Sequence, residues 1–151
     1  MRRACRDRGL GSTALHELPI AFGPSFPPHH LDPAGEDAAD HPLVAYLRAH
    51  PEITGILARN DAAACRIANL FARVGWTVPG DYSLIGYDDV DALRDDAGRN
   101  ILTSMRVPLE EIGQTAVELL TRLIAANTTS AEHIILPTEL IVRGTTGTPR
   151  A

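Results

Sequence analysis

Two polar pairs that each follow an apolar run hold the residues best suited to chemistry. One run ends just before Asn60-Asp61 and the other just before Asp88-Asp89. In an open parallel sheet, ligands bind beyond the carboxyl ends of the strands. If the two runs are neighbouring strands, Asn60 and Asp88 project into the same crevice. An amide and a carboxylate there would suit a ligand with hydroxyl groups or ring nitrogens, so the pattern indicates a binding site.

The same residues also have structural interpretations. Asn60 or Asp61 could cap the following helix, because a side-chain oxygen accepts a backbone N–H at that position. Asp88 could simply close a turn. Spacing alone favours these structural roles over ligand binding.

The case for an enzyme has no positive support in the sequence. Asp88 and Asp89 could form an acid–base pair of a hydrolase, but adjacent residues on an extended chain point in opposite directions. His29-His30 could suggest a metal site, yet neither a nearby cysteine nor a helical i, i+4 histidine accompanies them, which favours a solvated loop. GxSxG, Walker and GxGxxG motifs are absent. We therefore predict no catalytic residues, no cofactor and no metal.

Strand and helix signals alternate after residue 41 and must position these polar residues. The pattern predicts helices over 42–50, from 60 or 61 to about 74, and from 108 to 125, and extended runs over 53–58, 82–87, 101–107, 132–136 and 139–143. The second helix has a continuous apolar stripe, with Gly75 suited to its C-terminus. Pro108 suits the first turn of the third helix. This order of elements predicts an α/β sheet.

Composition excludes several classes of protein. The 151 residues are 44% hydrophobic and 22% charged, which is typical of a globular domain, and the net charge of −5 argues against a free-standing nucleic-acid binder. No apolar run approaches the roughly 18 residues of a membrane span. Cys5 and Cys65 lie far apart without a CxxC spacing, so two reduced thiols and a cytoplasmic location are expected.

Four segments in the same order and spacing resemble the LacI/GalR family of transcription regulators. Asn60-Asp61 followed by residues 75–89 is similar to the pattern ND…G…VPxDxSxxGxDD, and residues 102–108 resemble LTTxxxP. Residues 110–120 resemble EExGxxA…LL, and residues 136–146 resemble the closing LPxELxxRxST. Each piece alone is weak, but four in register are specific. The resemblance therefore favours a binding role for Asn60 and Asp88 over the structural one.

The resemblance implies a type I periplasmic-binding-protein-like fold, with two α/β subdomains closing on a small effector such as a sugar or nucleoside. Asn60 and Asp88 fall on effector-contacting positions, whereas Asp61 and Asp89 fall beside them in structural roles as cap and turn. Phe26 is a candidate for stacking on the ligand. The intact family member is a homodimer that binds DNA through a helix-turn-helix headpiece and is not associated with a membrane.

The match covers residues 42–147, so we expect an incomplete member of this family. Residues 1–40 would form a truncated helix, a strand and a Pro/Gly-rich loop, 41–147 the C-terminal part of the effector-binding domain, and 148–151 a tail. The helix 108–125 and the strand 133–136 would belong to the missing N-terminal subdomain, leaving leucines such as Leu109 and Leu120 partly exposed. Effector binding by this chain alone would be weak or absent. The alternative is a fragment of a stand-alone sugar-binding protein of a transport system.

Overall fold

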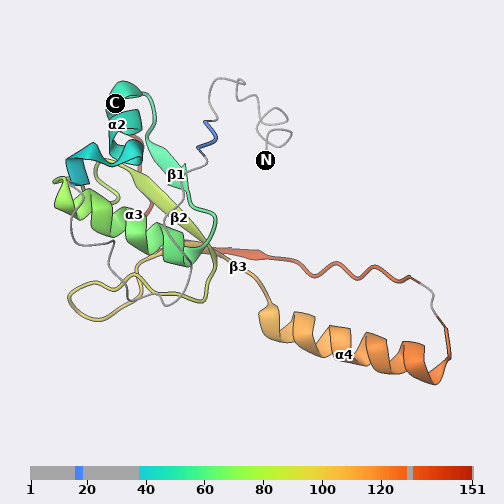
Figure 1. Ribbon diagram of the computed structural model, residues 1–151. Coiled ribbons are helices and arrows are strands. Elements are labelled where there is room, and N and C mark those ends of the chain that lie inside the picture. Colours follow the sequence, from blue (N-terminus) through green and yellow to red (C-terminus); the bar gives the residue numbers. More distant parts are fainter. Residues whose placement is uncertain (1–15, 19–37, 129–130, 151) are drawn as a thin grey trace.

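The computed structural model describes residues 16–18, 38–128 and 131–150 (Figure 1). The expectations for Cys5, Phe26, His29 and His30, and for the Pro/Gly-rich loop around them, lie outside these residues. The elements are η2 (Ala38–Asp40), α2 (Pro42–Ala49), β1 (Gly55–Leu57), α3 (Asp61–Arg73), β2 (Ser83–Asp88), β3 (Thr103–Arg106), α4 (Leu109–Ala125) and β4 (Glu139–Ile141).

The four strands form one sheet in the order β1-β2-β3-β4. The first three are parallel to one another, and β4 pairs antiparallel with β3. The carboxyl ends of β1, β2 and β3 therefore lie at the same edge of the sheet. The predicted α/β class and parallel sheet are confirmed.

Helix α3 covers the sheet and supplies most of the core. Its apolar stripe is buried at Ala63, Ile67, Leu70 and Phe71, as the sequence pattern predicted, and α2 adds Leu43, Val44 and Leu47. The stripe ends at Gly75, whose φ of 77° is the left-handed conformation that glycine adopts readily after a helix. Phe71, Trp76 and Tyr82 then pack ring against ring, with centroids 5.0 to 5.2 Å apart.

The chain after β4 completes the sheet through two buried threonines. Thr145 donates its hydroxyl to the Leu84 carbonyl (2.7 Å) and accepts the Thr103 backbone N–H (2.8 Å), while its own carbonyl accepts the Leu84 N–H. Thr103 in turn accepts the Arg143 backbone N–H through its hydroxyl. Side-chain hydroxyls thus satisfy backbone groups that an ordinary ladder would pair.

Helix α4 lies apart from the rest of the described chain, and the segment 131–138 returns from it to β4 as an extended arm (Figure 1). None of its residues is buried; the exposed fraction is 52% at Leu109 and 58% at Leu120. The predicted exposure of these leucines is confirmed. Among the described helices, none is long and apolar enough to cross a membrane.

The predicted strand over 132–136 is wrong. These residues have no secondary structure, and Ile134 and Ile135 are 50% and 92% exposed. Apolar, β-branched residues favour a strand, but a strand also needs a partner for its backbone hydrogen bonds, and no strand of the described residues pairs with the arm.

Replacing Thr145 by valine tests how much the buried hydroxyl stabilises the sheet. Valine has the same shape but leaves the Thr103 N–H without an acceptor, so we expect the free energy of unfolding to fall by about 1–3 kcal/mol. Urea unfolding followed by circular dichroism measures it. The exposed Thr138→Val is the matched control, and equal effects from the two substitutions would contradict this role.

Candidate functional site

The strand register brings the two predicted polar pairs to the same edge of the sheet. Leu57 of β1 lies opposite Ile85 of β2, so three residues further on Asn60 and Asp88 follow at neighbouring strand ends. Asp88 in turn lies opposite Arg106 of β3. The edge at which parallel-sheet proteins bind ligands therefore carries both residues that the sequence selected.

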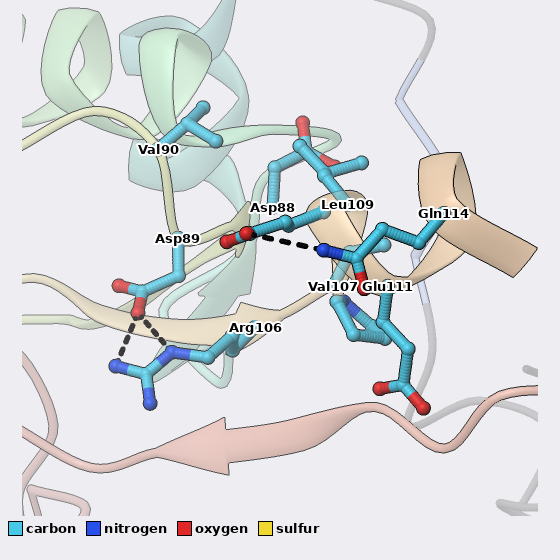
Figure 2. A pocket seen from close by; sticks show the side chains of 10 residues that line it. Asp88, Asp89, Val90, Arg106, Val107, Leu109, Glu111 and Gln114 are labelled. Carbon is cyan, nitrogen blue, oxygen red and sulfur yellow. Dashed lines mark hydrogen bonds and ion pairs between the residues drawn. The ribbon is translucent and has the colours of Figure 1, made fainter.

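A groove of about 470 Å³ opens at this edge, between the ends of β2 and β3 and the first turns of α4 (Figure 2). Its lining residues come from three segments: the end of β2 and the residues after it (Asp88, Asp89, Val90), the end of β3 (Arg106, Val107), and α4 with its N-cap (Pro108, Leu109, Glu110, Glu111, Gln114). Most of these side chains are polar or charged, which suits a hydroxyl-rich ligand.

Asp88 is the carboxylate that remains available in this groove. Within the part of the chain that the structure describes, the side chain of Asp88 accepts no hydrogen bond, whereas its backbone carbonyl accepts the Val107 N–H. Partial burial raises the pKa of its carboxyl, and the nearby negative charges of Asp61 and Asp91 raise that pKa further. Its φ of 98° lies in a region that side chains rarely adopt, a strain found often at functional sites.

Asn60 has a structural role that the sequence also allowed. Its Oδ1 accepts the Ala63 backbone N–H at 2.9 Å, which makes it the N-cap of α3. Asn60 does not line the groove, although it lies at the adjacent strand end. Of the two predicted binding residues that the structure describes, only Asp88 lines the groove. Since Oδ1 of Asn60 accepts the Ala63 N–H, the side-chain NH₂ group of Asn60 is the part left for a ligand.

Asp61 is fully buried and holds the turn that follows β2. One carboxylate oxygen accepts the Ser104 hydroxyl, and the other accepts the backbone N–H groups of Val90 (2.8 Å) and Asp91 (3.2 Å). A Cβ at Gly86 would lie 2.2 Å from the first oxygen, so only glycine fits there. Asp61 therefore fixes the backbone immediately after Asp88, and it is a positioning residue.

Asp89 is held by two arginines, Arg106 at the end of β3 and Arg143 in the segment that follows β4. Arg143 donates from Nη1 at 2.7 Å and Nη2 at 3.2 Å. Arg106 donates from Nε at 2.9 Å, and Figure 2 shows this second arginine beside Asp89. Hydrogen bonds from Arg143, and then from Arg106, hold the pKa of the Asp89 carboxyl below its ordinary value near 3.8. The two neighbouring aspartates thus differ. The side chain of Asp89 is ion-paired and 5% exposed, whereas that of Asp88 remains open to the groove.

Sequence reasoning missed the partners of these carboxylates. Ser104, Arg106 and Arg143 lie 43, 17 and 54 residues from the aspartates they contact. All four residues involved stand within the segments that resemble the LacI/GalR pattern: Gly86, Ser104, Arg106 and Arg143. That was the signal that could have singled them out.

Comparison with known proteins agrees with this architecture. The model of the periplasmic binding protein-like domain matches residues 6–146. The lactose operon repressor of Rhizobium radiobacter is 32% identical over 105 residues, which cover 70% of this chain and 88% of that protein.

Solved structures give the same result. A LacI family transcriptional regulator from Arthrobacter sp. FB24 in complex with lactose is 35% identical with a TM-score of 0.57, covering 68% of this chain and 39% of that one. A regulator of the same family from Enterococcus faecalis V583 with bound ribose is 31% identical with a TM-score of 0.60, covering 78% and 43% of the two chains.

This chain belongs to the LacI family of transcriptional regulators and corresponds to part of their periplasmic binding protein-like domain. It spans 39% and 43% of the two solved regulators, although it spans 88% of the Rhizobium radiobacter relative. These relatives bear the names of transcriptional regulators and not of enzymes.

Replacing Asp61 by asparagine tests its hold on the turn. The amide matches the carboxylate in size but has no charge and offers one acceptor oxygen in place of two, so Ser104, Val90 and Asp91 can no longer all donate to a charged acceptor. We expect a loss of about 2–3 kcal/mol in the free energy of unfolding, because hydrogen bonds to a charged group are the stronger kind. Hydrogen exchange at the Val90 and Asp91 amides should accelerate as well. The exposed Asp96→Asn is the control, and unchanged exchange at both amides would contradict the assignment.

The Asp89 ion pairs predict a pH dependence of stability. Because folding lowers the pKa of this carboxyl, its contribution is present above pH ~3.8 and is lost as the pH falls through the folded value. Asp89→Asn should therefore destabilise the chain at pH 7 by about 3 kcal/mol, since it leaves Arg143 without its charged partner. Urea unfolding between pH 7 and pH 2.5 should show this difference shrinking below pH 4. A difference that is constant with pH would contradict the ion-pair explanation.

Proposed function

We propose that this chain is the effector-sensing part of a LacI-type transcriptional regulator and that Asp88 binds the effector. The observation that carries the proposal is the open Asp88 carboxylate in a groove at the carboxyl ends of the parallel strands. Its neighbours Asp61 and Asp89 are engaged with partners inside the protein, so they are not free to bind a ligand. Membership of the LacI family supports the same assignment.

The effector class that fits best is a sugar. A carboxylate accepts hydrogen bonds from hydroxyl groups, and the groove adds Gln114 and Glu111 as further polar partners. Solved relatives of this family carry lactose and ribose. The amide of Asn60, at the end of the adjacent strand, would donate to a second hydroxyl of the same ligand, and an aromatic ring such as that of Phe26 would stack on the apolar face of the sugar.

The regulation follows from differential binding. In a complete homodimeric regulator, the effector would bind one conformation of the cleft more tightly and shift the population toward it. That shift would change the affinity of a DNA-binding headpiece for its operator by the same coupling free energy. The chain would act in the cytoplasm, where the operator DNA is located.

The proposal is tested by titrating the isotope-labelled chain with lactose, ribose, cellobiose and other sugars while recording amide NMR spectra. This method detects the weak binding expected for part of a cleft. We expect at least one sugar to shift the amides around Asp88, Val107 and Gln114. Asp88→Asn should weaken that binding about tenfold, because a charged acceptor contributes about 1.4 kcal/mol or more.

Asp96→Asn is the matched control, since it makes the same chemical change on an exposed side chain outside the groove. It should leave the sugar affinity unchanged. The proposal fails if the shifted amides lie away from the carboxyl ends of the strands, or if Asp88→Asn binds the sugar as tightly as the control.

A further inference from the structure

Three potential metal ligands meet near the C-terminal end of α2, outside the groove. They are His16, His50 and Glu52, whose ligand atoms all lie within 4.8 Å of one another. The Glu52 Oε1 atom lies 3.0 Å from His50 Nδ1 and 3.8 Å from His16 Nε2. His50 and Glu52 belong to one turn, whereas His16 precedes that turn by more than 30 residues, so the fold is needed to bring His16 to the other two.

A fourth residue orients one of these ligands. The Tyr46 hydroxyl lies 2.6 Å from His16 Nδ1, which leaves Nε2 of the same ring facing Glu52. Metal-bound histidines in proteins almost always use their second ring nitrogen in a hydrogen bond of this kind, which fixes the orientation of the ring. Tyr46 also packs against His50, with ring centroids 4.2 Å apart.

The backbone around the cluster is held by several hydrogen bonds. His50 is the C-cap of α2, and its carbonyl accepts the Ile53 N–H, which closes a turn with Glu52 inside it. Arg150 donates to the carbonyls of Pro51 and Ile53, on either side of Glu52. These hydrogen bonds fix the backbone positions of His50 and Glu52 with respect to each other before any ion binds.

We infer that His16, His50 and Glu52 form a binding site for a divalent transition-metal ion such as Zn²⁺. Two imidazoles and a carboxylate are a ligand set that zinc takes, with a fourth position for water. Bonds of about 2.0–2.2 Å in tetrahedral geometry place ligand atoms roughly 3.4 Å apart. The two separations that involve Glu52, 3.0 and 3.8 Å, lie on either side of that spacing, and the ligand atoms of the third pair lie within 4.8 Å, so side-chain rotation would have to bring the three ligand atoms to the tetrahedral spacing.

The site would join the segment 16–18 to the end of α2. An ion that binds only the folded chain stabilises it in proportion to the logarithm of the ion concentration relative to its dissociation constant. Zinc should therefore raise the unfolding temperature of the chain without involving the sugar groove, because none of the three ligands lines that groove.

The experiment uses the whole chain without a histidine tag, stripped of metal with EDTA and titrated with ZnCl₂ in a calorimeter. We expect one zinc ion per monomer, confirmed by native mass spectrometry. His16→Gln, His50→Gln and Glu52→Gln should each weaken zinc binding at least tenfold. Tyr46→Phe should also weaken it by about tenfold, since loss of a group that orients a ligand costs 10–100-fold.

His133→Gln is the matched control, because His133 is exposed on the arm that follows α4. It should bind zinc like the unmodified chain, and circular dichroism without metal should show every variant folded. The inference is overturned if the unmodified chain binds no zinc, if His16→Gln binds it as tightly as the control, or if one ion joins two chains in a dimer.

Discussion

The architecture of the candidate site depends on one buried charge, the carboxylate of Asp61. A charge inside a protein is costly unless hydrogen bonds replace those it made to water. Asp61 meets this requirement with the Ser104 hydroxyl and two backbone N–H groups, and its place in the first turn of α3 is favourable for negative charge. Satisfying it ties α3, β3 and the turn after β2 together. It also excludes any side chain at Gly86.

Three aspartates at this edge of the sheet differ because of their partners. Asp61 is buried with three donors, and Asp89 is paired with two arginines, so both are committed to the fold. Asp88 has no such partner, and its neighbours of the same sign raise the pKa of its carboxyl. The cost of holding Asp88 at a positive φ is offset by the bonds that its neighbours make. Because Asp61 and Asp89 are engaged inside the protein, the carboxylate of Asp88 is the one of the three that is open to a ligand.

Helix α4 shows how far an amphipathic pattern determines a structure. The pattern was enough to form a helix of 17 residues, yet its apolar residues remain largely exposed. A helix gains most of its stability in a protein from packing its apolar face, and the pattern does not say which surface covers that face. The chain spans less than half of the solved regulators it resembles, and in this structure α4 has no buried residue.

Local patterns in the sequence determined the α/β class, the apolar stripe of α3, its end at Gly75 and the presence of Asn60 and Asp88 after two strands, whereas the sheet order made those strands neighbours. These features depend on the period of the side chains and on single-residue preferences, which nearby residues reveal. The tertiary structure decided that Asn60 and not Asp61 caps α3, that Arg143 binds Asp89, and that residues 132–136 form no strand. Each of these depends on what lies beside a residue from elsewhere in the chain: Ser104 engages Asp61, Arg143 reaches Asp89, and residues 132–136 lie beside no described strand. Such a contact has no period along the sequence, so only the folded chain specifies it.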